Sequence, residues 1–125
     1  MPETALTVLT DATFTTTVIG NPNGAQEGRD ARVPVVVDFW AEWCPPCGPM
    51  ARHLAELAGE FEDRLLIAKI NADENPETTR LHRVMSMPTL LFFKRGVVVN
   101  SLVGLRPKAV LRQALNAVLT PYVNR

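Results

Sequence analysis

An almost continuous apolar run, VVVDFW at residues 35–40, constrains the fold of this chain more than any other segment. Its β-branched residues favour a strand over a helix, and apolar residues at successive positions are typical of a parallel strand covered on both faces. We therefore expect residues 35–40 to form the central strand of a sheet with helices on both sides. Asp38 is the one charged residue in the run.

The other apolar segments alternate between strand and helix patterns. Further strands are expected at residues 6–9, 65–70, 89–93 and 97–99, the last two joined as an antiparallel hairpin by Lys94-Arg95-Gly96. A helix is expected from Phe14 to Ile19, and the side-chain oxygens of Thr10 and Asp11 could cap its start. Further helices are expected after the cysteines (Met50, Leu54, Leu57, Ala58, Phe61), from Asn75-Pro76 to His82, and after Pro107 (Leu111, Leu115, Val118, Leu119, Tyr122). The order β-α-β-α-β-α-β-β-α predicts the α/β class, as a three-layer α/β/α sandwich with a mixed central sheet.

The size and charge of the chain limit the number of domains and the kinds of partner that we expect. A length of 125 residues predicts one domain, 1–125, with a tail at 1–4 and a surface loop at 20–33, and a monomer is the default expectation. Thirteen basic and thirteen acidic residues cancel, so neither nucleic acid nor a membrane surface is an expected partner. The start lacks a basic segment followed by an apolar one, and no run approaches the roughly 18 apolar residues of a membrane span. The expected location is the cytoplasm.

The segment WCPPCGP, residues 43–49, holds the only two cysteines. Two cysteines at i and i+3 at a helix start can approach closely enough for a disulfide, with Cys44 beyond the helix and Cys47 in its first turn. Unpaired N–H groups and the partial positive charge of a helix N-terminus stabilise a thiolate, which makes Cys44 the candidate nucleophile. Cys47 is then placed to attack the resulting mixed disulfide and release the substrate.

Three prolines surround these sulfurs. Pro45 and Pro46 are tolerable because the first N–H groups of a helix have no internal acceptor. Pro49, by contrast, is expected to distort the first turn, eased by Gly48.

A bare CxxC motif also fits half of a zinc site or a buried structural thiol pair. Zinc would need two more ligands, and the candidates, His53, His82 and carboxylates, stand at no recognised spacing. A redox pair that follows a strand and opens a helix in a βαβ setting is the favoured interpretation.

Asp38 and Lys69 interrupt two neighbouring apolar strands. If Asp38 is buried, its pKa should rise, so that it could exchange a proton with Cys47; an exposed carboxylate at a sheet edge is the alternative. Lys69 could pair with Asp38, or could be a surface lysine whose stem lies along apolar groups.

With the blocks PVVVDFWAEWCPPC, LLIAKINADENPE, MPTLLFFKRG and SLVG in this order, residues 5–121 resemble a thioredoxin. The resemblance implies Cys44 as attacking thiolate, Cys47 as resolving thiol and Asp38 as the buried acid that serves Cys47. It also implies a cis peptide at Met87-Pro88 beside the disulfide, and an apolar docking surface formed by Trp43, Met87 and Gly104 around an exposed sulfur.

The chain departs from the family pattern at several positions. CPPC followed by Gly48 replaces CGPC followed by a basic residue, Arg52 stands where a proline commonly kinks the helix, and Ser86-Met87 replaces a glycine and a branched aliphatic residue. Because the intervening dipeptide tunes the stability of dithiol against disulfide, we expect Pro45 and Gly48 to change the redox potential, in a direction that the sequence does not fix.

The resemblance implies a protein-disulfide reductase without a bound cofactor or metal, reduced by a flavin- and NADPH-dependent thioredoxin reductase and acting on client proteins with disulfides. Two other functions fit the same fold. One is a disulfide oxidase, an isomerase or a dedicated donor to one client, and the other is a binding module in which the cysteines have little role.

Overall fold

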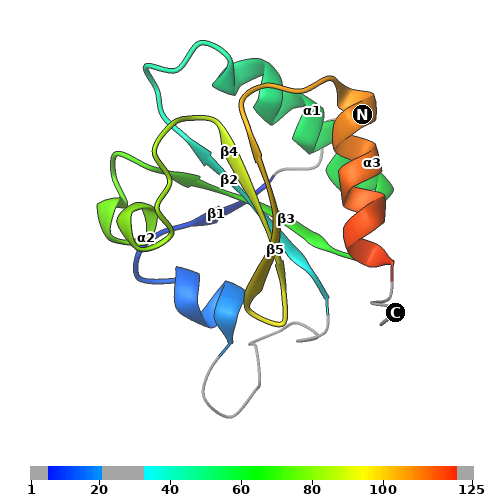
Figure 1. Ribbon diagram of the computed structural model, residues 1–125, viewed down its shortest axis with the longest axis horizontal. Helices are drawn as coiled ribbons and strands as arrows, with labels where there is room; N and C mark the ends of the chain where they lie inside the picture. The colour runs from blue at the N-terminus through cyan, green and yellow to red at the C-terminus, as the bar shows by residue number, and fades with distance from the viewer. Residues whose placement is uncertain (1–5, 21–32, 121–125) are drawn as a thin grey trace.

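A five-stranded mixed sheet forms the centre of the computed structural model, which describes residues 6–20 and 33–120 (Figure 1). The strands are β1 (Thr7–Leu9), β2 (Val35–Trp40), β3 (Leu66–Asn71), β4 (Thr89–Lys94) and β5 (Val97–Val103). Their order across the sheet is β1-β3-β2-β4-β5. β2 and β1 run parallel to β3, whereas β4 runs antiparallel to both β2 and β5. The expected central position of residues 35–40 is confirmed.

Helices cover both faces of the sheet. They are η1 (Thr15–Ile19, a single π-helical segment), α1 (Cys47–Glu60), α2 (Pro76–Leu81) and α3 (Lys108–Leu119). α1 and α3 lie side by side on one face, and η1 and α2 lie on the other (Figure 1). The α/β/α sandwich with a mixed sheet is therefore confirmed, as is the element order, with a π-helix in the first helical position.

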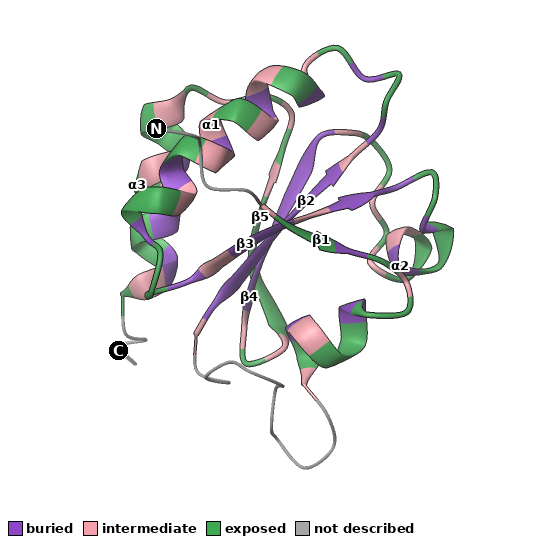
Figure 2. Cartoon of the chain, turned by 180° about the vertical axis from the view of Figure 1, so that it is seen from behind, coloured by how far each residue is buried: buried purple, intermediate pink, exposed green. Residues whose placement is uncertain are grey.

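Successive residues of β2 serve two separate cores, which explains its continuous apolar pattern. Val36 joins the core under α1 and α3, whereas Val37 and Phe39 join the core on the side of η1 and α2. All five residues from Val35 to Phe39 are buried (Figure 2). Asp38, which alternates with Val37, therefore faces α1.

The β4–β5 connection is a two-residue turn at Arg95-Gly96, with φ of 52° and 81°. Positive φ at both central residues is the geometry of a type I′ turn, whose twist matches that of an antiparallel hairpin. A Cβ on Gly96 would lie 3.1 Å from the carbonyl oxygen of Ile19, so glycine fits where the hairpin meets η1. The expected hairpin is confirmed, although its second strand extends to Val103 rather than ending at residue 99.

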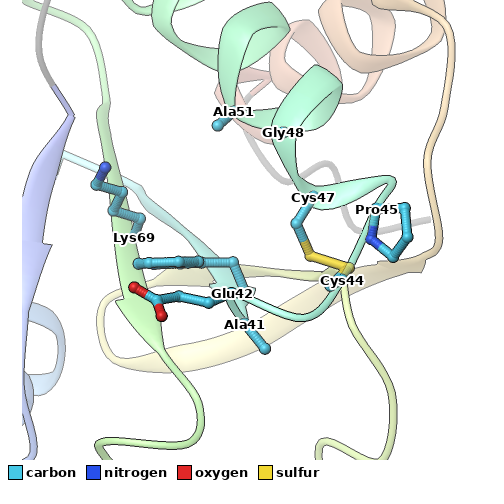
Figure 3. A pocket seen from close by; sticks show the side chains of 9 residues that line it. Ala41, Glu42, Cys44, Pro45, Cys47, Gly48, Ala51 and Lys69 are labelled. Carbon is cyan, nitrogen blue, oxygen red and sulfur yellow. A yellow bond between two sulfur atoms is a disulfide. The ribbon is translucent and has the colours of Figure 1, made fainter.

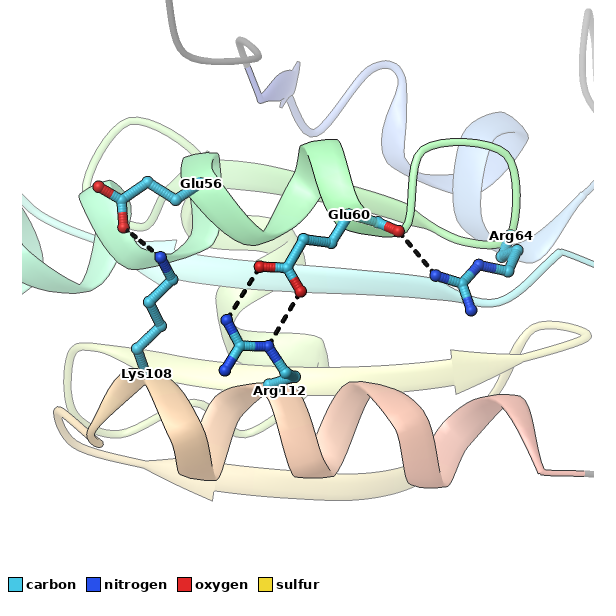
Figure 4. A network of polar contacts seen from close by, with 5 residues as sticks. All are labelled: Glu56, Glu60, Arg64, Lys108 and Arg112. Atoms are coloured by element: carbon cyan, nitrogen blue, oxygen red, sulfur yellow. Dashed lines mark hydrogen bonds and ion pairs between the residues drawn. The ribbon is translucent and has the colours of Figure 1, made fainter.

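Exposed ion pairs join α1 to α3 (Figure 4). Lys108 Nζ lies 2.7 Å from Glu56 Oε1, and the Arg112 guanidinium donates to both carboxylate oxygens of Glu60 at 2.9 Å. The hydrogen bonds from Arg112 hold the pKa of Glu60 below its ordinary value. These contacts link two helices whose apolar sides share one core.

The polar residues after β1 differ from the sequence-based expectation. Thr10 Oγ1 accepts the N–H of Thr13 at 3.3 Å, as a cap for the following turn should. Asp11 instead accepts the N–H groups of Thr78 (2.8 Å) and Glu77 (3.2 Å), at the start of α2. The hydrogen bond with the Thr78 side chain, together with these backbone bonds, lowers the pKa of Asp11. Asp11 thus ties the β1–η1 segment to a helix far along the chain.

Three expectations concern residues outside the described ranges: the tail at 1–4, most of the loop at 20–33, and Tyr122 on the last helix. α3 itself ends at Leu119. Among the helices at 6–20 and 33–120, none has the length and apolar character needed to cross a membrane.

Candidate active site

The two cysteines lie where β2 gives way to α1, and they form a disulfide with a Cα–Cα separation of 5.4 Å (Figure 3). The turn before the helix is closed by backbone bonds from Cys44 N to the Ala41 carbonyl (3.3 Å) and from Cys47 N to the Cys44 carbonyl (3.1 Å). Cys44 is 5% exposed and Cys47 is 4% exposed. The loop and its neighbours therefore cover most of both residues, although both line the cleft beside the disulfide.

The prolines fit the start of α1 better than the sequence suggested. Pro46 is the N-cap residue, and its carbonyl accepts the N–H of Met50 at 3.2 Å, an ordinary first helical bond. Pro49 therefore stands at the third helical position, where an N–H would have no acceptor within the helix. The distortion expected from Pro49 is not observed. A Cβ on Gly48 would meet no atom within 4 Å, so no steric requirement explains glycine there.

Asp38 is 0% exposed, and neither of its carboxyl oxygens has a hydrogen-bond partner. Burial raises its pKa from 3.8 to about 7, and the positive charge of Lys69 opposes part of that rise. The expected burial and raised pKa are thus confirmed, and the alternative of an exposed carboxylate is wrong. A carboxyl group with this pKa holds a proton below neutral pH and releases it just above.

Of the two alternatives for Lys69, the structure shows the lysine whose stem lies along apolar groups, and not the ion pair with Asp38. The two residues are opposite each other in the β2–β3 register, yet Asp38 has no hydrogen-bond partner and the Lys69 ammonium lies 5.7 Å from the Trp40 ring centroid. A buried ion pair would require the removal of water from both charges, whereas the long stem of a lysine lets the ammonium stay at the surface over an aromatic ring. Lys69 therefore acts on Asp38 through its charge.

A cleft of about 600 Å³ opens beside the disulfide (Figure 3). Lys69 and the disulfide lie on opposite sides of it in this view. Its lining combines sulfur, aromatic and charged groups: Trp40, Ala41, Glu42, Cys44, Pro45, Cys47, Gly48, Ala51 and Lys69. The cleft gives water and small solutes a route to the surroundings of Cys47.

The residues expected to form the docking surface divide into two groups. Met87 packs on the cluster of Ala41, Cys44 and Cys47, and the Met87-Pro88 peptide is cis, as the resemblance implied. Gly104 donates its N–H to the Pro88 carbonyl at 2.7 Å, with φ of 94°. Trp43 lies outside that buried cluster, 63% exposed, and its indole N–H donates to Asp73 at 2.7 Å.

The sequence is similar to known proteins over most of its length. The family model described as Thioredoxin matches residues 6–117. The chain belongs to the thioredoxin family. It is 44% identical to a thioredoxin from Alicyclobacillus acidocaldarius over 92% of this chain and 99% of the relative, and 42% identical to a thioredoxin from Mycobacterium tuberculosis over 93% and 90%. A thioredoxin from Acidithiobacillus ferridurans is 49% identical over 69% of this chain and 80% of its own length.

Thioredoxins are thiol-disulfide oxidoreductases, and the Cys44–Cys47 pair at disulfide distance makes this chain one of them. Its function is the reduction of protein disulfides. Within the described ranges, no three His, Cys, Asp or Glu side chains gather as a metal-ligand set.

Sequence reasoning missed three residues of this thioredoxin site. Trp40 and Glu42 line the cleft, and Asp73 holds the Trp43 indole. A signal was available, because the carboxyl ends of neighbouring parallel strands meet at one edge of a sheet. Trp43 follows the end of β2 and Asp73 follows the end of β3, so the two were candidates for contact.

Proposed function

We propose that Cys44 is the attacking thiolate in the reduction of client disulfides. When Cys44 attacks, the client disulfide breaks, a Cys44–client disulfide forms, and one client sulfur leaves as a thiolate that takes a proton. Cys47 then attacks Cys44, which releases the second client thiol and forms the Cys44–Cys47 bond. The client gains two electrons and two protons, and this chain loses the same number. The position of Cys44 just before a helix N-terminus supports this role.

We assign Asp38 the role of proton acceptor for Cys47, directly or through a water in the cleft. The observation that carries this role is a fully buried carboxyl group with no partner on the α1 side of β2. Since burial raises its pKa to about 7, Asp38 can take the Cys47 proton once the pH exceeds that value. Lys69 tunes this pKa through its charge. The resolving step should therefore become faster as the pH rises through 7.

Trp43, Met87, Pro88 and Gly104 form the proposed surface that holds an extended client segment against Cys44. Their support is the packing of Met87 on the sulfur cluster and the exposure of Trp43. We propose that a flavin- and NADPH-dependent thioredoxin reductase returns the disulfide to the dithiol, and that the protein needs no resident cofactor.

Insulin disulfide reduction tests these roles, with NADPH and thioredoxin reductase as the electron source. We expect turnover that disappears in Cys44→Ser, while Cys47→Ser accumulates a covalent complex with the client. Activity with dithiothreitol but not with the reductase would point to another electron donor. Client binding without turnover would contradict the reductase assignment and favour a binding module.

The CPPC sequence and Gly48 carry a second proposal, that the redox potential of this pair differs from that of a CGPC pair. Pro45 restricts the backbone between the cysteines, and the open space around Gly48 accepts a side chain. Pro45→Gly and Gly48→Lys should each move the potential measured against glutathione. Since about 30 mV corresponds to roughly 1.4 kcal/mol for two electrons, even modest changes are measurable. A potential that moves in neither variant would remove the proposal.

A further inference from the structure

Four chain segments meet at the end of the sheet that carries the disulfide. β2 and β3 end there because they are parallel, β4 starts there because it runs antiparallel to β2, and β5 ends there because it runs antiparallel to β4. Asp73 follows β3 and Arg106 follows β5, so in the strand order they lie on opposite sides of Cys44 and the Met87-Pro88 peptide. This end of the sheet therefore has an acidic residue on one side and a basic residue on the other.

The Arg106 guanidinium lies over Gly104, one of the residues of the proposed client surface. Gly104 donates its N–H to the Pro88 carbonyl at 2.7 Å, so it is directly beside the cis peptide. A Cβ on Gly104 would lie 3.2 Å from Arg106 Nη1, and apart from the chain neighbours no other atom of the described residues lies within 4 Å of it. The side of Gly104 without a side chain is thus open except for this guanidinium. A client segment that contacts Gly104 from that side also meets Arg106.

Within the described ranges, the Arg106 charge has no carboxylate partner. Its Nη1 donates to the carbonyl of Leu105, the preceding residue, at 3.3 Å. Lys108, the next basic residue, is paired with Glu56 at 2.7 Å. A guanidinium carries several N–H donors in one plane, which match the two oxygens of a carboxylate. Arg106 therefore has donors available for a carboxylate that a client supplies.

We propose that Arg106 selects client segments with an Asp or Glu side chain close to the attacked cysteine, on the β5 side of Cys44. This inference rests on the proposed function and names the kind of client that the same site accepts. β5 lies two strands from β2 in the sheet order. Neighbouring strands are about 4.8 Å apart and an extended segment advances about 3.3 Å per residue, so the acidic residue should stand about three residues from the cysteine.

The selection depends on which side of the cysteine the acidic residue occupies. At the β3 side, the Asp73 carboxyl group accepts the Trp43 indole N–H at 2.7 Å. A client carboxylate placed there would face a like charge, whereas the same carboxylate at the β5 side would face Arg106. An acidic residue should therefore favour reduction on one side of the client cysteine and not on the other.

Release of thiopyridone from activated peptides tests the proposal. Each peptide has one cysteine, as a mixed disulfide with thiopyridine, and an Asp or a Lys about three residues before or after it. The reduced full chain attacks the peptide sulfur, because thiopyridone is the better leaving group; thiopyridone departs with the electron pair and takes a proton. Cys47 then releases the peptide as a thiol and closes the disulfide with Cys44. The second-order rate constant of thiopyridone release is measured for every peptide.

On one side of the cysteine, the rate constant should be about fivefold higher for the Asp peptide than for the Lys peptide. On the other side the ratio should be one or lower. The preference should largely disappear in about 1 M salt, where the Debye length is only about 3 Å.

Variants of Arg106 assign this preference to its charge. Arg106→Gln should bring the ratio of the two rate constants close to one, Arg106→Lys should retain most of it, and Arg106→Glu should reverse it. Arg95→Gln is the matched control, because it removes the same charge from the exposed hairpin turn at the opposite end of the sheet, and it should keep the wild-type ratio. A role limited to supporting the loop would change the rate constants of all peptides by one factor and leave their ratio intact.

Two results would overturn the proposal while the reductase assignment stands. One is equal rate constants for the Asp and Lys peptides on both sides of the cysteine. The other is a preference for Asp that persists in Arg106→Gln, which would assign the selection to another cation. Absence of thiopyridone release from every peptide, or release at the wild-type rate by Cys44→Ser, would instead contradict the proposed function itself.

Discussion

Two buried polar groups on neighbouring strands of this sheet have opposite surroundings. Asn71, at the end of β3, accepts the N–H groups of Asp73 and Glu74, and Asn75 donates to its carbonyl at 3.0 Å. Asp38, in β2, has no hydrogen-bond partner although it is more deeply buried.

This difference distinguishes a polar group that stabilises the fold from one whose protonation can change. Polar groups with hydrogen-bond partners stabilise one arrangement of the loops. Burial of a carboxyl group without a partner instead raises its pKa. The asparagine cluster therefore positions the active-site loops, whereas Asp38 has the raised pKa that its proposed role in proton exchange requires. Four variants test whether this separation is real.

The largest expected effect is a gain of stability in Asp38→Asn. Because burial raises the Asp38 pKa from 3.8 to about 7, the folded chain keeps a proton between about pH 4 and pH 7 that the unfolded chain has released. The stability of the wild type thus falls as pH rises through that window. At roughly 1.4 kcal/mol per pKa unit, the full cost above pH 7 is on the order of 4 kcal/mol.

Urea unfolding of the oxidised protein between pH 5 and pH 9 measures this effect. The Asp38→Asn curve should be nearly flat and should exceed the wild type by about 2–4 kcal/mol at pH 8, while disulfide reduction slows. Asp63→Asn, at an exposed carboxylate, is the matched control and should leave the profile unchanged. A wild-type stability independent of pH would contradict the buried, partnerless state of Asp38.

Asn75→Ala should have the opposite effects to Asp38→Asn, with a lower stability and an unchanged rate of disulfide reduction. Asn75 donates to the Asn71 carbonyl and accepts the N–H of Asp11 at 2.8 Å, so truncation leaves both of those groups without a partner. We expect a loss of about 1–3 kcal/mol in the unfolding free energy and an unchanged rate of insulin reduction per folded molecule. Asn116→Ala, at an exposed position on α3, is the control. A large loss of rate in fully folded Asn75→Ala would mean that the asparagine cluster and Asp38 do not have separate roles.

Lys69→Gln tests how the charge of Lys69 affects the pKa of Asp38. Removing the positive charge should raise the Asp38 pKa above about 7, because Lys69 lowers it. The midpoint of the pH–rate profile should move upward, so that the rate at pH 7 falls by a few-fold. Lys69→Arg retains the charge and should retain the midpoint. Equal pH–rate profiles for Lys69→Gln and Lys69→Arg would show that Lys69 does not act on Asp38 through its charge.

The smallest effect is expected for Trp43→Phe, which links the two regions through Asp73. One exposed hydrogen bond is lost, so stability should change by less than about 1 kcal/mol. If Trp43 helps to hold clients, KM for insulin should rise a few-fold while kcat is retained. A fall in kcat at constant KM would place Trp43 in the chemical steps instead.

The sequence predicted the elements that depend on local patterns. The apolar run of β2 and the Arg95-Gly96 turn have strong local signals, and CPPC marked the start of α1. Among the site residues, the burial and the raised pKa of Asp38 followed from its place in an apolar strand.

Contacts between distant segments were beyond the same reasoning. Asp11 caps α2 instead of its own segment. For Lys69 the sequence left open an ion pair with Asp38 and a surface lysine, and the structure shows the second, with the ammonium over Trp40. Each outcome depends on which segments tertiary packing brings together, and no local pattern encodes that. Pro49 was misjudged for a different reason, since a shift of one residue in the helix start decides whether an N–H is needed.

The start of α1 has a consequence for how long client complexes last. Pro45 and Pro46 fix φ at both positions between the cysteines, so the 5.4 Å spacing of the two Cα atoms depends little on the sulfur–sulfur bond. In a mixed disulfide, Cys47 therefore stays beside Cys44 at a high effective concentration, because little freedom is lost when the bond closes. Under the proposed mechanism, each client is held by a covalent bond that the protein itself removes quickly. Such a protein can serve many clients in succession without accumulating any of them.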